Sequence, residues 1–261
     1  MEQASLHIER YEMKYRIPLH MVSVIRDAVL RYCVPDDANK GGRYLITSLY
    51  LDSPDRRLYQ DTAHRSPRRF KLRVRRYSTG NYFLEVKRKV KDVIAKTRCG
   101  ISAESWPTAF HDPTTVDPAL FDGIGARAYQ EFINKSLATM AEPATLVRYE
   151  REAYVSTTDD YARVTFDHNL LAAAPNGWEV EIDNSVRWQP ADTPGNFGLP
   201  FSGVVLELKC TSTVPYWMAD LVNQFNLKRS GFSKYQCCLD RVEPRRLKAP
   251  SRLTSLYPSY V

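Results

Sequence analysis

Two neighbouring segments decide the fold, FKLRVRRY at residues 70–77 and YFLEVK at residues 82–87. Apolar and charged side chains alternate along both, and a period of two is typical of a β-strand with one apolar and one polar face. The residues between them, Ser78 to Asn81, carry turn chemistry. One face of this predicted strand pair therefore collects charge, from Lys71, Arg73, Arg75, Glu85 and Lys87.

Most of the chain shows the same alternation. Further strands are predicted at residues 7–16, 44–51, 92–99, 145–155, 163–167, 178–183, 204–209 and 232–240. Apolar residues at helical spacing predict helices at residues 18–33, 118–140 and 214–228. The chain is therefore expected to be α+β, with its strands in an antiparallel sheet.

The polar faces of these strands are dense in Arg, Lys and Glu rather than in Ser and Thr. For a single strand, a polar face turned to water is the ordinary explanation. For the whole set, apolar faces on one side need cover from the helices, and charges gather on the other. We therefore expect a closed antiparallel β-barrel with a charged lumen and helices packed on the outside, because closure also removes exposed strand edges.

The net charge of +7 is unevenly distributed. Residues 65–98 hold thirteen Lys or Arg and two acids, a local charge of +11, so the other 227 residues sum to −4. So many cations in one lumen would repel each other without a polyanion. A triphosphate or longer phosphate chain is the matching ligand, held by Arg forks and Lys ammoniums. Carboxylates beside it would hold a hard divalent cation that bridges phosphate oxygens.

Several common site types are excluded by their motifs. The five cysteines form no C-x-x-C pair, which argues against a zinc ribbon and a disulfide framework. The sequence holds no P-loop, no G-x-S-x-G elbow and no H-E-x-x-H. Residues 123–128 match G-x-G-x-x-A, but the residues before them do not read as a strand, so we predict a helix there instead of a dinucleotide site.

No apolar run approaches the roughly 18 residues that span a bilayer. The first fourteen residues mix acids, bases and His, unlike a signal peptide. A cytoplasmic protein with no membrane span is expected. Residues 1–240 are predicted to form one domain, followed by a basic tail at residues 241–261 with five Lys or Arg and one Glu.

Eight short motifs follow one another along the chain. They are RYEMKY at 10–15, SLYLDS at 48–53, FKLRVRRY at 70–77, FLEVK at 83–87, YER at 149–151, RVTFD at 163–167, LELK at 206–209 and SKY at 233–235. In this order they resemble the VTC domain, the polyphosphate polymerase domain of vacuolar transporter chaperone complexes and its bacterial relatives. That family belongs to the CYTH-like triphosphate tunnel metalloenzymes. The resemblance implies a β-barrel tunnel in which ATP donates its γ-phosphate to a growing polyphosphate chain.

Carried over by position, the resemblance also implies site residues. Those implied in catalysis are Lys14, Arg73, Arg75, Lys87, Arg151, Arg163 and Lys234. Those implied in substrate binding are Arg10, Lys71, Lys89, Lys96, Arg98, Lys209, Ser233 and Tyr149. The implied ligands of Mn²⁺ or Mg²⁺ are Glu207 first, then Glu12 and Glu85. Related triphosphatases and cyclases carry E-x-E-x-K in the first strand, and Arg10 in place of the first Glu favours the polymerase branch.

Three functions stay open on these residues: a phosphotransferase making polyphosphate, a metal-dependent triphosphatase, and a non-catalytic sensor of phosphate chains. A nucleic-acid binder is disfavoured, since the cations alternate with apolar residues and so point into a lumen. Tyr50, Tyr77 and Tyr149 are predicted to pack in the wall rather than stack on bases. Export of a product would need a membrane-protein partner, because the chain carries no membrane segment.

Overall fold

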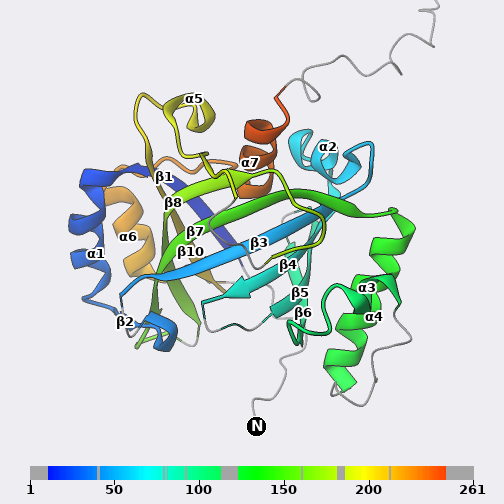
Figure 1. The fold of residues 1–261 in the computed structure, drawn as a ribbon. Coiled ribbons are helices and arrows are strands. Elements are labelled where there is room, and N and C mark those ends of the chain that lie inside the picture. The colour runs from blue at the N-terminus through cyan, green and yellow to red at the C-terminus, as the bar shows by residue number, and fades with distance from the viewer. Residues whose placement is uncertain are drawn as a thin grey trace, which may run out of the picture.

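The structure is a computed structural model that describes residues 11–39, 42–78, 80, 82–91, 93–112, 123–159, 161–180, 186–211 and 213–244. One antiparallel sheet forms its centre, with strands along its main path in the order β1-β10-β8-β7-β3-β4-β5-β6 (Figure 1). The strands are β1 (Tyr11–Pro18), β2 (Cys33–Pro35), β3 (Tyr44–Asp52), β4 (Arg68–Tyr77), β5 (Tyr82–Val90), β6 (Val93–Ile101), β7 (Glu142–Ser156), β8 (Ala162–Ala173), β9 (Gln189–Pro190) and β10 (Gly203–Cys210).

Helices lie between the strands along the chain. They are α1 (Val22–Val29), α2 (Arg57–Ala63), α3 (Thr108–His111), α4 (Gly123–Ala138), α5 (Pro194–Phe197), α6 (Tyr216–Gln224) and α7 (Lys234–Val242), with 3-10 turns η1 (Leu19–Met21) and η2 (Asp37–Asn39). The predicted α+β class is confirmed, and so are the three predicted helices, which correspond to α1, α4 and α6. The G-x-G-x-x-A match lies inside α4, as expected. In the part of the chain described, no helix has the length and apolar character needed to cross a bilayer.

The strand predicted at residues 232–240 is wrong, because these residues form helix α7. Ser233 caps the helix, and its hydroxyl accepts from the backbone N–H of Gln236. Tyr235, Cys238 and Leu239 are buried, and their spacing of three and four residues is helical. The strand predicted at residues 178–183 is not confirmed either, since residues 178–180 belong to no strand and 181–185 lie outside the described residues.

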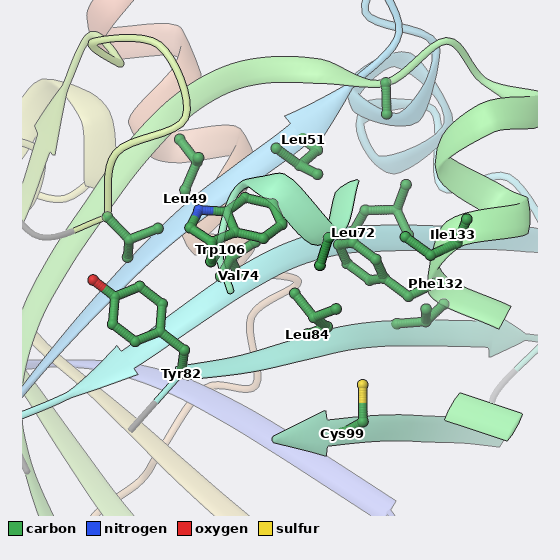
Figure 2. Packing of buried hydrophobic residues seen from close by; sticks show 14 of the residues in the cluster. Leu49, Leu51, Leu72, Val74, Tyr82, Leu84, Cys99, Trp106, Phe132 and Ile133 are labelled. Carbon is green, nitrogen blue, oxygen red and sulfur yellow. The ribbon is translucent and has the colours of Figure 1, made fainter. Parts of the chain in front are cut away.

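Alternation along the strands sorts the side chains into two faces. On the convex face, Leu72 and Val74 of β4 and Leu84 of β5 are buried and pack with Phe132 and Ile133 of α4 (Figure 2). Helices α1 and α6 cover β1, β8 and β10 through a second apolar cluster. Because the apolar side of the sheet is buried under helices, the charged side is left on the concave face.

The predicted closed barrel is wrong: the sheet curls into an open half-barrel (Figure 1). Within the described residues, β1 and β6 end the sheet, and no backbone ladder joins them. A side chain spans the opening instead, since Lys87 of β5 contacts Glu12 of β1. The backbones of β1 and β6 come near each other, but closure would require a ladder of hydrogen bonds with the strands about 5 Å apart.

Helix α7 departs from the prediction that helices pack on the outside. It packs against Tyr50, Val147 and Val205 in a third cluster, and Val205 shares its face of β10 with Glu207 because they are two residues apart. Tyr235 of α7 stacks on Tyr50 with ring centroids 4.9 Å apart. One helix therefore covers part of the concave face and brings its first residues to the charges there.

Candidate functional site

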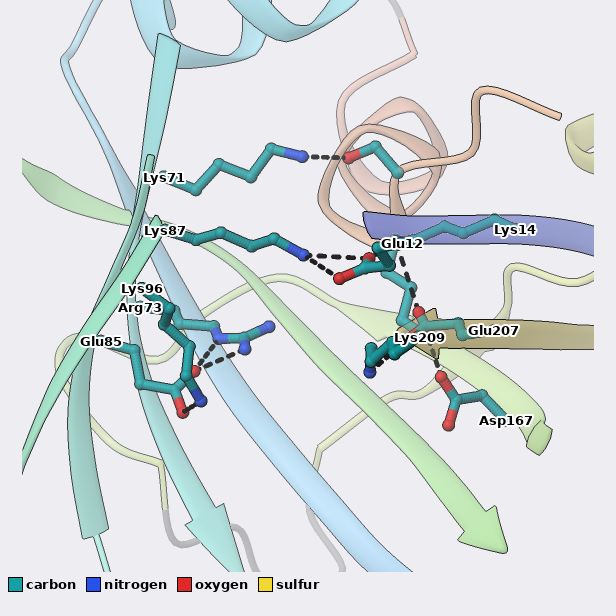
Figure 3. Close-up of polar contacts among 12 residues, drawn as sticks. Glu12, Lys14, Lys71, Arg73, Glu85, Lys87, Lys96, Asp167, Glu207 and Lys209 are labelled. Carbon is teal, nitrogen blue, oxygen red and sulfur yellow. Dashed lines mark hydrogen bonds and ion pairs between the residues drawn. The ribbon is translucent and has the colours of Figure 1, made fainter. Parts of the chain in front are cut away.

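The concave face carries two groups of charged side chains that point toward each other (Figure 3). One group comes from β4, β5 and β6. The other comes from β1, β7, β8, β10 and the start of α7. Together they comprise nine cations and four carboxylates, which we call the charged face: Lys14, Lys71, Arg73, Arg75, Lys87, Lys96, Arg151, Lys209 and Lys234 with Glu12, Glu85, Asp167 and Glu207.

Glu85 is the centre of the first group, and its side chain is wholly buried. Arg73 donates to it through Nε at 2.7 Å, Lys96 Nζ lies 3.3 Å away, and Arg75 Nε lies 3.8 Å away. Burial alone would raise the pKa of Glu85, but Arg73 and Arg75 hold that pKa well below its usual range. Glu85, implied as a metal ligand, is therefore a fixed anion that holds two arginines and a lysine in place.

Three tyrosine hydroxyls hold the same arginines. Arg73 donates to Tyr50 at 2.9 Å, and Arg75 donates to Tyr77 at 3.2 Å and to Tyr149 at 3.4 Å. A guanidinium with several fixed acceptors has few rotamers left, so its outward N–H groups are preorganised for an anion. The sequence predicts that these three rings pack in the wall, and the family resemblance also implies Tyr149 in substrate binding. Their positions on the strand face that carries Arg73 and Arg75 were the available signal for a polar role.

Glu207 and Asp167 form the centre of the second group. Lys209 lies 2.9 Å and Lys234 2.8 Å from Glu207, and Arg151 donates two bonds to Asp167 at 2.6 and 2.7 Å. Lys234 also pairs with Asp167. Burial raises the pKa of Glu207, yet its lysine neighbours hold that pKa well below its usual range. Asp167 therefore fixes the orientation of the Arg151 guanidinium.

Glu12 and Lys14 connect the two groups. Lys14 Nζ lies 3.1 Å from Glu12 and 3.3 Å from Glu207. Lys87 Nζ lies 2.8 and 3.0 Å from the two Glu12 oxygens. Glu12 therefore accepts from cations on both sides of the half-barrel.

Lys71 has no carboxylate partner among the described residues; its ammonium donates to the hydroxyl of Ser233 at 2.7 Å. Burial, together with the nearby Lys14 and Lys87, lowers its pKa well below the usual range. Burial also lowers the pKa of Lys87 to about 8 and that of Lys96 to about 7, although Glu12 and Glu85 oppose these shifts. In the free protein these lysines lose their protons more readily than exposed lysines do. An anion bound at the site would stabilise their charged forms.

The charged face has five more cations than carboxylates. An excess of this size on an enclosed surface is costly unless an anion binds. Lys71 and the outward edges of the arginines face the space that such an anion would occupy. The arrangement fits a linear anion with many oxygens, because the cations follow the strands rather than meet at one point.

Arg163 and Arg98, both implied as site residues by the resemblance, contact groups outside the charged face. Arg163 pairs with Asp36 at 2.8 Å, and Arg98 lies over the ring of Phe83 at 5.0 Å. Lys89 follows Lys87 on the same face of β5. Arg10 lies outside the described residues.

Two carboxylates of the charged face, those of Glu12 and Glu207, would hold a divalent ion if phosphate oxygens completed its ligands. The described residues include no group of three or more His, Cys, Asp or Glu placed to hold a metal. Glu12 and Glu207, however, both contact the ammonium of Lys14, so they lie close enough to share a cation. Mg²⁺ is commonly held by one or two carboxylates plus phosphate oxygens.

A comparison with known protein families shows to which family the protein with this charged face belongs. The family model described as the VTC domain matches residues 9–242, nearly the whole chain. The chain belongs to the VTC domain family. The match spans every strand of the sheet and α7, so all members of the charged face lie within this VTC domain. No curated protein matches the chain.

Solved structures resemble the VTC domain at low identity. A protein from Vibrio parahaemolyticus described as an adenylate cyclase shares 14% identity at a TM-score of 0.43, covering 94% of this chain and 100% of that one. PH1819 from Pyrococcus horikoshii shares 11% at 0.46, covering 89% and 99%. HpAC1 from Hippeastrum, described as an adenylyl cyclase with a dominant triphosphatase activity, shares 16% at 0.46, covering 92% and 99%. These TM-scores are too low to support an argument about this chain.

Proposed function

We propose that this VTC domain is a metal-dependent phosphotransferase that moves the γ-phosphate of ATP onto a polyphosphate chain. The charged face carries the proposal: nine cations and four carboxylates line one concave surface, and Lys71 has no carboxylate partner among the described residues. A phosphate chain supplies the missing negative charge along the strands. Membership of the VTC family supports the same reaction.

Phosphoryl transfer needs positioning and charge neutralisation more than covalent help from the protein. Arg73 and Arg75, fixed by Glu85 and the tyrosines, bind the equatorial oxygens of the transferring group. Arg151, fixed by Asp167, faces them from the opposite group. Because hydrogen-bonded guanidiniums need little rearrangement, their stabilisation of the developing charge is available throughout the reaction.

The acceptor is the terminal phosphate of the chain, which is already an anion at neutral pH. No strong general base is therefore required to make it a nucleophile. Lys14 and Lys234, whose ammoniums contact Glu207, orient donor and acceptor. Lys71 binds the phosphate oxygens nearest to Ser233, because its ammonium lies 2.7 Å from that hydroxyl.

Glu207 and Glu12 would hold a divalent ion, Mg²⁺ or Mn²⁺, together with phosphate oxygens. When bound, the ion neutralises charge on the phosphates and supports their in-line alignment. Glu85 is excluded from this role in the proposal, because its side chain is wholly buried, whereas those of Glu12 and Glu207 are 10% and 5% exposed.

Hydrolysis is the second candidate, and the lysines favour it. Attack by water needs a group that accepts a proton near neutral pH. Lys96, with a pKa lowered to about 7 by burial and neighbouring arginines, can be neutral there. A triphosphatase would use the same charged face with water in place of the phosphate acceptor.

Incubation with ATP and Mn²⁺, followed by gel electrophoresis and orthophosphate analysis, tests the proposal. Long phosphate chains would support the polymerase. Orthophosphate without chains would replace it by the triphosphatase, and tight triphosphate binding without either product would leave a sensor. The variant Arg75→Ala should lose activity. Arg88→Ala is the matched control, because Arg88 pairs with Glu131 of α4 at 2.6 Å on the convex side.

The proposal extends to the surroundings of the reaction. ATP and a phosphate chain or triphosphate are the proposed ligands, the cytoplasm is the proposed compartment, and a membrane protein is the proposed recipient of an exported chain. Residues 1–240 are proposed as one domain, with 241–261 as a basic tail. Helix α7 crosses this boundary, since it continues to Val242. Glu243, the next residue, pairs with Arg56 at 2.8 Å.

A further inference from the structure

One end of the concave face is aromatic rather than charged. Tyr44 of β3, Tyr77 of β4 and Phe83 of β5 lie there side by side, and we call them the aromatic end. The ring centroids of Tyr44 and Tyr77 are 6.3 Å apart, and those of Tyr77 and Phe83 are 5.6 Å apart at 84°. The guanidinium of Arg98 lies 5.0 Å from the centroid of Phe83. Three adjacent strands thus present a continuous set of rings.

The register of the strands places these rings directly beside the phosphate-binding arginines. Phe83 pairs with Arg75 across β4 and β5, and it lies two residues before Glu85 on the same face. Tyr77 lies two residues after Arg75, and its hydroxyl accepts from that guanidinium at 3.2 Å. The aromatic end is therefore continuous with the charged face.

Phe83 has an unusual position for an apolar ring. It is only partly buried, and it belongs to none of the three apolar clusters formed by the described residues. Its partner across β5 and β6 is Gly100, which has no side chain to cover the ring. Arg98 lies over the ring and Tyr77 contacts its edge, yet Phe83 stays partly exposed.

The other aromatics of the concave face do not share this exposure. Tyr50 is 5% and Tyr149 is 2% exposed. Tyr50 stacks on Tyr235 of α7, and Lys234 lies 4.9 Å over the ring of Tyr149. These two rings are occupied by contacts within the domain, so they support packing. Tyr44 and Tyr77 pack against the third cluster but stay partly exposed, so Phe83 is the ring of the aromatic end that lies outside the three clusters of the described residues.

We propose that the aromatic end binds the base of the nucleotide donor by stacking, which fixes the direction of the donor along β5. The inference rests on the proposed function. The base lies at Phe83, and the terminal phosphate points toward Lys87 and Lys71. Phe83 and Lys87 are four residues apart, about 13 Å along the strand, a length that the ribose and the inner phosphates would occupy. Aromatic rings and Arg planes both stack on bases.

This placement separates two kinds of ligand. A nucleoside triphosphate uses both the aromatic end and the charged face, whereas inorganic tripolyphosphate uses the charged face alone. Loss of a stacking ring therefore weakens only nucleotide binding. A general loss of structure or of charge would weaken both.

Isothermal titration calorimetry on the full chain tests this difference, with a non-hydrolysable β,γ-imido analogue of ATP and with tripolyphosphate, each in Mg²⁺. Phe83→Leu keeps an apolar side chain but removes the ring. We expect it to weaken binding of the ATP analogue about tenfold and to change tripolyphosphate binding less than twofold. Phe83→Trp should restore nucleotide binding. Arg88→Ala, on the convex face, should change neither.

Equal losses for both ligands in Phe83→Leu, or no loss for the nucleotide, would overturn the inference and leave the proposed function standing. Wild-type protein that bound neither ligand would overturn both. Photolabelling of the wild-type chain with 8-azido-ATP provides a second measurement that needs no variant. Labelling that ATP displaces should lie at Tyr77, at residues 82–83 of β5 or at residues 98–100 of β6. Labelling confined to other segments would contradict the placement.

Discussion

Lys87 of β5 reaches across the concave face to Glu12 of β1, and its ammonium lies 2.8 and 3.0 Å from the two carboxylate oxygens. No backbone ladder joins the two ends of the sheet among the described residues, so this ion pair spans the opening. Lys14 contacts the same carboxylate. The two sides of the opening are therefore linked by the ion pair of Glu12 with Lys87, and Lys14 shares that carboxylate. A phosphate chain would contact the same two lysines.

Replacement of this lysine should separate function from stability. In Lys87→Ala, Glu12 keeps Lys14 as a partner, and the Lys87 side chain is 29% exposed. We expect the free energy of unfolding to fall by about 1 kcal/mol or less. Affinity for tripolyphosphate should fall at least tenfold, because a phosphate-facing cation is lost. Calorimetric binding and urea unfolding measure the two effects, and a variant with unchanged affinity would remove Lys87 from the site.

Glu85→Gln should act mainly on stability. The side chain is wholly buried, and its removal leaves the buried charges of Arg73 and Arg75 uncompensated. Breaking a buried ion pair from one side costs about 3–5 kcal/mol, which urea unfolding would detect. Glu150→Gln is the control, because Glu150 is 38% exposed and lies 3.5 Å from Arg43. If both variants unfolded at the same urea concentration, Glu85 would not be the centre of its group.

Binding of a phosphate chain should take up protons between about pH 7 and 8. Burial and neighbouring arginines lower the pKa of Lys96 to about 7, and burial lowers the pKa of Lys87 to about 8. A bound anion favours their charged forms, so affinity should fall as the pH rises through this range. Titrations in buffers with different ionisation enthalpies measure the uptake.

The variant Lys96→Arg isolates one of these protons, because arginine stays charged throughout the range. When the phosphate chain binds, this variant should take up fewer protons than the wild type. Its affinity for the chain should also fall less than that of the wild type when the pH is raised to 8. The same pKa shift affects stability in the opposite sense. Since the unfolded chain binds more protons between about pH 7 and the ordinary lysine pKa of 10.5, the free protein should gain stability as the pH rises across that window.

Removal of divalent ions should abolish turnover but leave the fold intact. The structure of the charged face depends on ion pairs between its own residues, so EDTA should change the unfolding temperature by only a few degrees. Mn²⁺ or Mg²⁺ should restore activity. Glu207→Gln should raise the metal concentration needed for half-maximal activity. Full activity in EDTA would remove the metal from the proposed mechanism.

Local alternation made much of the site predictable. In β4 and β5, successive side chains point to opposite faces, so Lys71, Arg73 and Arg75 share a face whatever the rest of the chain does. The family resemblance then implied Glu12, Glu85, Glu207 and Lys234, which the structure places on the charged face. The partners of these residues were not predictable, because Tyr50 and Arg73 meet only through pairing of β3 with β4.

Residues 232–240 show how one period can be misread. An apolar run with Cys237 and Cys238 was interpreted as a strand, although Tyr235, Cys238 and Leu239 also fit a helix. Short apolar runs fit both periods. The helix forms because Ser233 caps it and its apolar side is buried against Tyr50 and Val147.

The sequence by itself determined which side chains share a face, because that depends on the local geometry of a strand. It also determined that cations outnumber carboxylates on this face. Only the tertiary structure decided that the sheet stays open between β1 and β6, that α7 enters the concave side, and that rings gather at one end. These features depend on how far the sheet curls and on contacts between residues distant in the chain, which no local period encodes.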